Sequence, residues 1–225
     1  MAGPHGQEIM MAGVTVRSIC IGQPQPFNGA EMSAIAKLPV SGDAEIRDFG
    51  IVGDMVADTR VHGGIDMAIH HYPRDHYDWW REKLGPHPLL DSANAFGENI
   101  VATGLTESDV HIADRFRLGT AVLEVSQPRQ PCWKIDHRFG VKGMAAEVVR
   151  SHRSGWYYRV LEEGFARAGD ELHRIEKGHA DWPVARVFAK IYDKESQPQR
   201  DELEAIAALE GLSDKLRDRV RKAIS

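Results

Sequence analysis

Residues 121–134 have the sequence AVLEVSQPRQPCWK, and this stretch sets the expectations for the rest of the chain. Its first five residues alternate and are rich in β-branched side chains, which predicts a β-strand. Two prolines, Pro128 and Pro131, are expected to end that strand and to stiffen the turn that follows. The next residue is Cys132. The sequence therefore predicts one cysteine held in a rigid loop at the end of a strand.

This cysteine can be a reactive or a metal-binding residue, because thiolate is the nucleophilic and metal-ligating form. Arg129 and Lys134 are close to Cys132 in the sequence. Cations that turn toward the sulfur would lower its pKa from the usual value of about 8.5. A lone cysteine after a strand is more often a small buried hydrophobe. Two prolines and two cations in residues 126–134 make a poor core segment, however, so we predict a functional site here.

The composition is that of a folded globular protein with an acidic charge balance. The chain has 225 residues, 42% of them hydrophobic and 27% charged, and a formal net charge of −5. It can form one substantial core, or one domain plus a small appendage. Since phosphate neutralisation needs a basic surface, the charge argues against general nucleic-acid binding. A local basic pocket for one small anion remains compatible with it.

No segment predicts a membrane or a secreted protein. No apolar run approaches the roughly 20 residues of a membrane helix, and residues 1–12 lack the features of a signal peptide. We expect a loose leader there, no membrane partner and a cytoplasmic protein. Cys20 and Cys132 lie far apart and form no CxxC pair, so neither a disulfide nor a zinc ribbon is expected. Cys20 lies in an alternating run, and packing is its expected role.

Short alternating segments dominate residues 14–175 and predict β-structure. We expect strands at residues 14–22, 34–40, 67–72, 115–119, 121–125, 156–161 and 168–175, a connection at 23–28, and helices at 73–85 and 141–152. The strands on either side of Gly119 and Thr120 are predicted to form a hairpin. A closed or nearly closed β-barrel with peripheral helices, a mixed α/β domain over residues 13–177, is the most economical arrangement.

Residues 178–225 change to helical periodicity. Three apolar stripes follow one another at i, i+3, i+4 spacing, and Pro183, Pro198 and Ser213 mark their starts. Three short helices have too little core to be stable alone. We therefore predict a small three-helix C-terminal domain that docks on the barrel or on a partner.

An anion site is predicted where Arg60 and His62 precede the paired Gly63 and Gly64. Glycines let the backbone approach a ligand closely, and alternation places Arg60 and His62 on one face. This combination suits an anion. A tight hairpin turn explains the two glycines equally well.

Two other polar clusters are ambiguous. In residues 95–100, Asn99 can offer a donor and an acceptor to the edge of a heterocycle, whereas Glu98 is as well suited to brace a loop by accepting backbone N–H groups. Adjacent His70 and His71 point to opposite faces of a strand, so they cannot easily share one metal. We therefore expect no dedicated zinc site.

Three motifs in this order resemble the MOSC domain, the module named for the C-terminus of molybdenum cofactor sulfurases. They are Arg60-Val61-His62-Gly63-Gly64, Phe96-Gly97-Glu98-Asn99 and residues 126–132, SQPRQPC. With the three terminal helices, the chain is similar to the YiiM-like branch of this family over nearly its whole length from Val14. Arg60 replaces a common lysine, and Met67 replaces a basic residue that often follows the aspartate of the motif.

The resemblance implies a β-barrel that binds the molybdenum cofactor, molybdenum on molybdopterin, with Cys132 as metal ligand and catalytic residue. Reductases of this family remove oxygen from N-hydroxylated compounds such as hydroxylaminopurine bases, a detoxification in which a partner flavoprotein or another reductase donates electrons. A homodimer is one option for the assembly. The residues expected to bind the cofactor are Arg60, His62, Gly63, Gly64, Asn99, Gln127 and Arg129.

Two other functions are compatible with the same residues. A sulfur carrier would hold a persulfide on Cys132 and pass it to a cofactor or cluster. It needs the thiolate but no pterin pocket, so Arg60→Ala with His62→Ala should leave it working. A non-catalytic module would bind the cofactor for storage or delivery and show no turnover.

Overall fold

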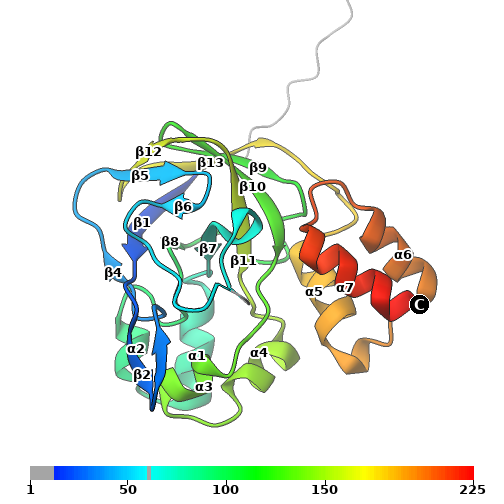
Figure 1. Cartoon of the computed structure of the whole chain (residues 1–225), viewed down its shortest axis with the longest axis horizontal. Helices are drawn as coiled ribbons and strands as arrows, with labels where there is room; N and C mark the ends of the chain where they lie inside the picture. The colour runs from blue at the N-terminus through cyan, green and yellow to red at the C-terminus, as the bar shows by residue number, and fades with distance from the viewer. Residues whose placement is uncertain (1–12, 60–61) are drawn as a thin grey trace, which may run out of the picture.

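The computed structural model describes residues 13–59 and 62–225, which form a β-barrel, a group of helices at one end of it and three further helices at its side (Figure 1). The barrel strands are β1 (Val14–Ile21), β7 (Ile69–His71), β8 (Ile100–Ala102), β9 (Arg115–Leu118), β10 (Ala121–Pro128), β11 (Trp156–Glu162) and β13 (Glu171–Glu176). Their order is β13-β9-β10-β11-β7-β8-β1, and β1 pairs with β13 to close the ring. This confirms the predicted mixed α/β fold with a β-barrel.

Short strands surround the barrel, and two expectations are wrong there. β2 (Gln25–Asn28) pairs with β3 (Glu31–Ser33), although residues 23–28 were expected to form only a connection. The expected strand 34–40 shrinks to β4 (Leu38–Pro39), which pairs with β1. The backbone of Lys37 bonds outside any strand ladder: its N–H donates to the carbonyl of Ile35, and its carbonyl accepts from the side chain of Asn94. A third sheet has the order β12 (Gly164–Ala166), β5 (Ala44–Arg47), β6 (Gly50–Ile51).

Strand β10 delivers the chain to the cysteine loop. It forms the predicted hairpin with β9 but continues to Pro128, because Gln127 and Pro128 still pair with β11. The expectation that the prolines end the strand after residue 125 is therefore wrong. The pairing shifts at Ser126, whose hydroxyl lies 2.6 Å from the carbonyl oxygen of Asp66. Proline lacks an N–H group, but at the end of a strand its missing hydrogen bond does not interrupt the ladder.

Four helices cover one end of the barrel (Figure 1). They are α1 (His76–Leu84), α2 (Pro88–Asp91), α3 (Lys134–Phe139) and α4 (Met144–Ser151). α1 and α4 were predicted, whereas α2 and α3 are too short for a periodic signal. An aromatic cluster holds this end together: the rings of Tyr72 and Phe96 stack 4.0 Å apart, and Trp80 donates to the Tyr72 hydroxyl over 2.6 Å.

The three predicted C-terminal helices are α5 (Val184–Tyr192), α6 (Arg200–Ala208) and α7 (Asp214–Ile224). Pro183 precedes α5, and the hydroxyl of Ser213 caps α7 by accepting from the N–H of Leu216. The helices dock on the barrel, because Val184 and Val220 belong to the same buried cluster as the barrel core. The domain boundary at residue 178 stays a prediction. In the part of the chain described here, no helix is long and apolar enough to cross a bilayer.

Candidate functional site

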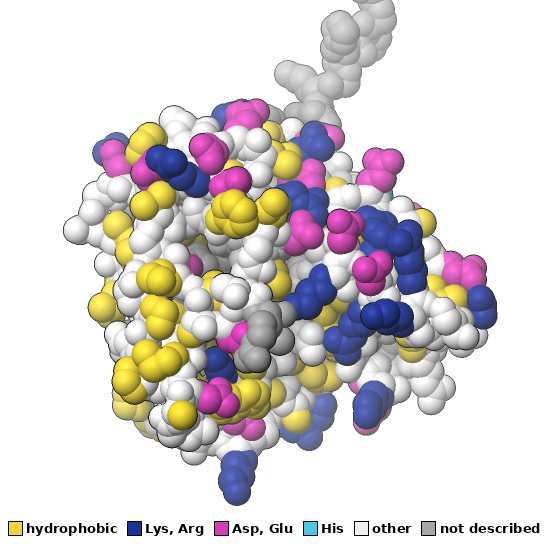
Figure 2. Space-filling model, in the orientation of Figure 1, with side chains coloured by type: hydrophobic (Ala, Val, Ile, Leu, Met, Phe, Trp, Pro, Cys, Tyr) yellow, Lys and Arg dark blue, Asp and Glu magenta, His cyan; other side chains and the backbone are white. Residues whose placement is uncertain are grey.

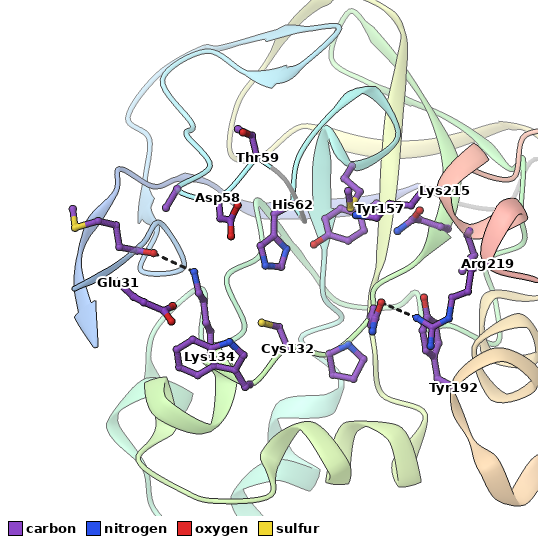
Figure 3. Close-up of a pocket in the computed structure, with 18 of the residues that line it drawn as sticks. Glu31, Asp58, Thr59, His62, Cys132, Lys134, Tyr157, Tyr192, Lys215 and Arg219 are labelled. Atoms are coloured by element: carbon purple, nitrogen blue, oxygen red, sulfur yellow. Dashed lines mark hydrogen bonds between the residues drawn. The ribbon is translucent and has the colours of Figure 1, made fainter. Parts of the chain in front are cut away.

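A large hollow lies between the loops at the end of the barrel and one face of α7, and Cys132 lies where its two chambers meet. The outer chamber, about 1130 Å³, extends from β3 and the loop around Asp58 to α7 (Figure 3). The inner chamber, about 290 Å³, continues into the end of the barrel toward His70 and Phe96. Cys132 lines both, is a free thiol and is partly buried. The predicted rigid loop therefore presents a sulfur atom to a cavity.

The structure gathers most of the predicted site residues around this hollow. Those that line one or both chambers are His62, Gly63, Gly64, Asn99, Gln127, Arg129 and Cys132. Arg60 lies outside the described residues. That these residues bind a cofactor stays a prediction.

Two buried side chains in the inner chamber have polar atoms without a partner. Arg129 is 6% exposed and His70 is 5% exposed. Among residues 13–59 and 62–225, Arg129 Nη1 donates no hydrogen bond and His70 Nε2 has no hydrogen-bond partner. A buried polar group without a partner costs about 1–3 kcal/mol. Such atoms therefore indicate a place where a bound molecule completes the hydrogen bonding.

The histidines of the site are held in the neutral form. Burial is the main cause that lowers the pKa of His62, and the cations of Arg129, Lys134 and Lys215 lower it further. Burial also lowers the pKa of His70 well below its usual value, and Arg129 adds to this. A neutral imidazole has one donor and one acceptor nitrogen. Near pH 7 each side chain can therefore offer a ligand one donor or one acceptor nitrogen, without carrying a positive charge.

The loop that carries His62 and the two glycines is pinned at Asp66. Arg159 binds the Asp66 carboxylate through two nitrogens, at 2.6 and 2.9 Å, and the N–H of Asp214 at the start of α7 lies 3.3 Å from its other oxygen. Gly64 has φ 93° and ψ 170°, a conformation open essentially only to glycine. A Cβ added there would meet open space. The backbone at Gly64 thus borders the inner chamber without a side chain in the way.

The amides of Asn99 and Gln127 are bound within the protein. Asn99 accepts from the N–H of His70 (3.0 Å) and donates to the carbonyl of Cys20 (2.9 Å) and to Asp54 (2.8 Å). Gln127 accepts a hydrogen bond from the hydroxyl of Ser213, which links β10 to α7. Both residues hold the walls of the hollow in register, in addition to lining it.

Glu98 accepts a backbone N–H group and braces a loop, a role the sequence suggested for it. It is fully buried, and its carboxylate accepts from the N–H of Phe96 (2.9 Å) and from the hydroxyl of Tyr77. Burial raises its pKa from 4.5 to about 7. Its contacts fix the segment that forms the floor of the inner chamber.

The other histidines do not gather around a metal. The ring of His71 points away from the chambers, with Nδ1 3.1 Å from the Tyr158 hydroxyl, while His76 pairs with Glu107 at 2.6 Å. Within residues 13–59 and 62–225, no group of three or more His, Cys, Asp or Glu side chains could hold a metal ion.

Sequence reasoning missed several residues of the hollow. The sequence placed His70 and His71 on opposite faces of a strand, but alternation alone does not show which of the two faces borders a cavity. Tyr157, Lys215 and Arg219 also line the outer chamber. The last two lie more than 80 residues from Cys132 in the chain, and only the docking of α7 brings them there. No local pattern could have found them.

The structure thus combines a closed barrel with a loop cysteine that faces a hollow lined by arginine and histidine, and the comparisons assign this chain to the MOSC domain family. Residues 58–173 match this family, and the chain belongs to it. It is 39% identical over 156 residues to Protein YiiM of Escherichia coli (strain K12), covering 69% of this chain and 70% of that protein. The crystal structure of YiiM from Geobacillus stearothermophilus superposes with a TM-score of 0.79 at 30% identity, covering 94% of this chain and all of the other.

A third relative has an enzymatic name. The chain is 38% identical over 162 residues to a protein named Reductase from Gibberella moniliformis (strain M3125 / FGSC 7600), covering 72% of this chain and 29% of that protein. The comparisons confirm the predicted family and its YiiM-like branch.

Proposed function

We propose that this chain binds the molybdenum cofactor and reduces N-hydroxylated compounds, with Cys132 as the protein ligand of the metal. The observation that carries this proposal is the position of a free, partly buried thiol at the junction of two chambers. Thiolate is a soft ligand suited to a metal in a sulfur-rich environment. Membership of the MOSC family and the similarity to a protein named Reductase support the same function.

The inner chamber fits the polar part of such a cofactor. A pterin with a phosphate group offers ring nitrogens, a carbonyl and anionic oxygens. The unpartnered atoms Arg129 Nη1 and His70 Nε2 match these acceptors, and guanidinium groups form strong hydrogen bonds to phosphate. The open space beside Gly64 admits the ligand against the backbone. Arg129, His70, His62 and Gly64 would therefore hold the cofactor, and Cys132 would hold its metal.

When bound, the cofactor supplies the two-electron chemistry that cleaves the N–O bond, and the electrons come from a donor reductase that we propose as partner. The protein supplies position and protons. Reduction of R–NHOH to R–NH₂ and water consumes two protons. Neutral His62 can pass a proton from solvent to the leaving oxygen. Burial raises the pKa of Tyr157, so its hydroxyl stays protonated and can donate a hydrogen bond to the substrate.

The first test is metal analysis of protein produced in a host that makes the cofactor. We expect molybdenum in the wild type and in Cys20→Ala, and at least a tenfold lower content in Cys132→Ser. Cys20 is the matched control because it is buried and lines neither chamber in the described part of the chain. Equal molybdenum in wild type and Cys132→Ser would remove Cys132 as ligand. No molybdenum in any of them would favour sulfur transfer.

The second test is turnover. The loaded protein should convert 6-hydroxylaminopurine to adenine with a reduced viologen dye as electron donor, which makes the assay independent of the natural partner. Activity should be lost with Cys132→Ser and kept with Cys20→Ala. A molybdenum-loaded wild type that converts none of the compound would favour a storage or delivery module.

A further inference from the structure

α7 contributes two cations to the outer chamber that the proposed chemistry does not use. Lys215 and Arg219 are four residues apart, hence neighbours on one face of the helix. Both line the outer chamber, on the side opposite Glu31 and Asp58 (Figure 3). Figure 2 shows Lys and Arg side chains gathered over the three C-terminal helices, while hydrophobic side chains are more frequent on the barrel side.

Arg219 is oriented by the cysteine loop itself. Its Nη1 donates to Oε1 of Gln130 over 3.0 Å, and Gln130 is two residues from Cys132. Its guanidinium also lies over the ring of Tyr192, with Cζ 4.8 Å from the ring centroid. A guanidinium fixed in this way loses little freedom when it binds an anion.

Lys215 lies one helical turn before Arg219 on α7 and lines the same chamber. Its positive charge is among those that lower the pKa of His62, after burial, Arg129 and Lys134. The field of α7 therefore reaches the side chains around Cys132. Asp58 opposes it from the other wall. Within the outer chamber, an anionic group is therefore attracted to the α7 side and repelled by the opposite side, which carries Glu31 and Asp58.

The size of the outer chamber exceeds what a free base needs. Ligand pockets for molecules of drug size measure about 300–1,000 Å³, and the outer chamber measures about 1130 Å³. A single purine ring placed near Cys132 would leave the space beside α7 filled with water. A ribose and a phosphate attached to that ring would extend across this space toward Lys215 and Arg219.

We propose that Lys215 and Arg219 bind the 5′-phosphate of the substrate, so that N-hydroxylated purine nucleotides are preferred over free bases and nucleosides. This inference rests on the proposed function. The reaction is unchanged: the N–O bond breaks, two electrons from the donor reductase and two protons are consumed, and an amine and water form. The phosphate ester takes no part in it and serves only recognition.

The test compares ligands that differ only in the phosphate. Binding of adenosine 5′-monophosphate and of adenosine to the cofactor-loaded protein is measured by calorimetry. A hydrogen-bonded charge pair contributes about 1.5–3 kcal/mol, so we expect the nucleotide to bind at least about tenfold tighter than the nucleoside. Lys215→Ala with Arg219→Ala should abolish this preference and leave adenosine binding unchanged. Equal affinities in the wild type would overturn the inference.

Lys222→Ala is the matched control, because Lys222 is an exposed cation of α7 and lines neither chamber in the described structure. It should keep the full nucleotide preference. Molybdenum content separates two sources of phosphate. If the double variant loses molybdenum, Lys215 and Arg219 hold the phosphate of the cofactor, and the inference is wrong.

Turnover distinguishes failure of the inference from failure of the proposed function. The kcat/KM for N6-hydroxyadenosine 5′-monophosphate should exceed that for N6-hydroxyadenosine by about tenfold, and the double variant should remove the difference. Equal kcat/KM values in the wild type would contradict the inference alone. No conversion of either compound, with the binding preference intact, would contradict the proposed function and leave the phosphate site in place.

Discussion

Replacement of Glu98 by glutamine should change how the stability of this protein depends on pH. Glu98 is fully buried, and burial raises its pKa from 4.5 to about 7. Because the folded state keeps this proton to higher pH than the unfolded state, the contribution of Glu98 to stability is complete below about pH 4.5 and is lost as the pH rises to about 7. Each pKa unit corresponds to about 1.4 kcal/mol, so the loss amounts to about 3 kcal/mol.

Glutamine cannot ionise, and its carbonyl can accept the same hydrogen bond from Phe96 or Tyr77. The Glu98→Gln variant should therefore lack this loss. The free energy of unfolding of the variant minus that of the wild type should therefore be about 3 kcal/mol larger at pH 8 than at pH 4.5. Because both proteins share all other titratable groups, the contributions of those groups cancel when the two free energies of unfolding are subtracted.

Urea unfolding followed by tryptophan fluorescence at several pH values between 4.5 and 8.5 measures this difference. Glu82→Gln, on the exposed face of α1, removes a carboxyl group without touching the Glu98 contacts and serves as control. If the free energies of unfolding of wild type and Glu98→Gln changed with pH in parallel, the pKa of Glu98 would be the same in the folded and unfolded states. The reasoning from burial would then be refuted.

Three further predictions concern the walls of the hollow and the barrel. Arg129→Met should raise the free energy of unfolding of the cofactor-free protein by about 1–3 kcal/mol in urea, because it removes a buried unpartnered atom, and should lower the molybdenum content. Gly64→Ala should cost about 1–3 kcal/mol through backbone strain alone, and more than Gly29→Ala, whose φ of 57° is tolerated better. Burial lowers the pKa of His71 to about 3, so its contribution is complete above pH 6.5 and is lost as the pH falls toward 3, by up to about 5 kcal/mol. An acid titration of unfolding should show this loss in the wild type and not in His71→Gln.

Local patterns predicted those parts of the fold in which one face is buried and the other is not. The hairpin of β9 and β10 and the three C-terminal helices follow from periods of two and 3.6 residues. The predicted end of β10 was wrong because the irregular pairing at Ser126 involves the carbonyl of Asp66, which is 60 residues away in the chain. Helix α3 was missed since six residues give too few repeats for a periodic signal.

The site was predictable where chemistry and local conformation coincide in a few neighbouring residues. Cys132 among prolines and Gly63 with Gly64 are of this kind, and both line the hollow. His70 needed knowledge of which strand face meets the cavity. Lys215 and Arg219 needed the docking of α7, a tertiary event for which the helix itself carries no sign.

The closure of the barrel by β13 has a consequence for how the molecule is assembled during synthesis. Strands β1 to β13 leave the ribosome before α7, so the ring can close while the last helices are still unmade. Tyr192, Lys215, Leu216 and Arg219 complete the outer chamber, so Cys132 faces a more open hollow until these helices dock. The nascent chain thus passes through a stage in which its thiol is most accessible, and docking of the last helix ends that stage.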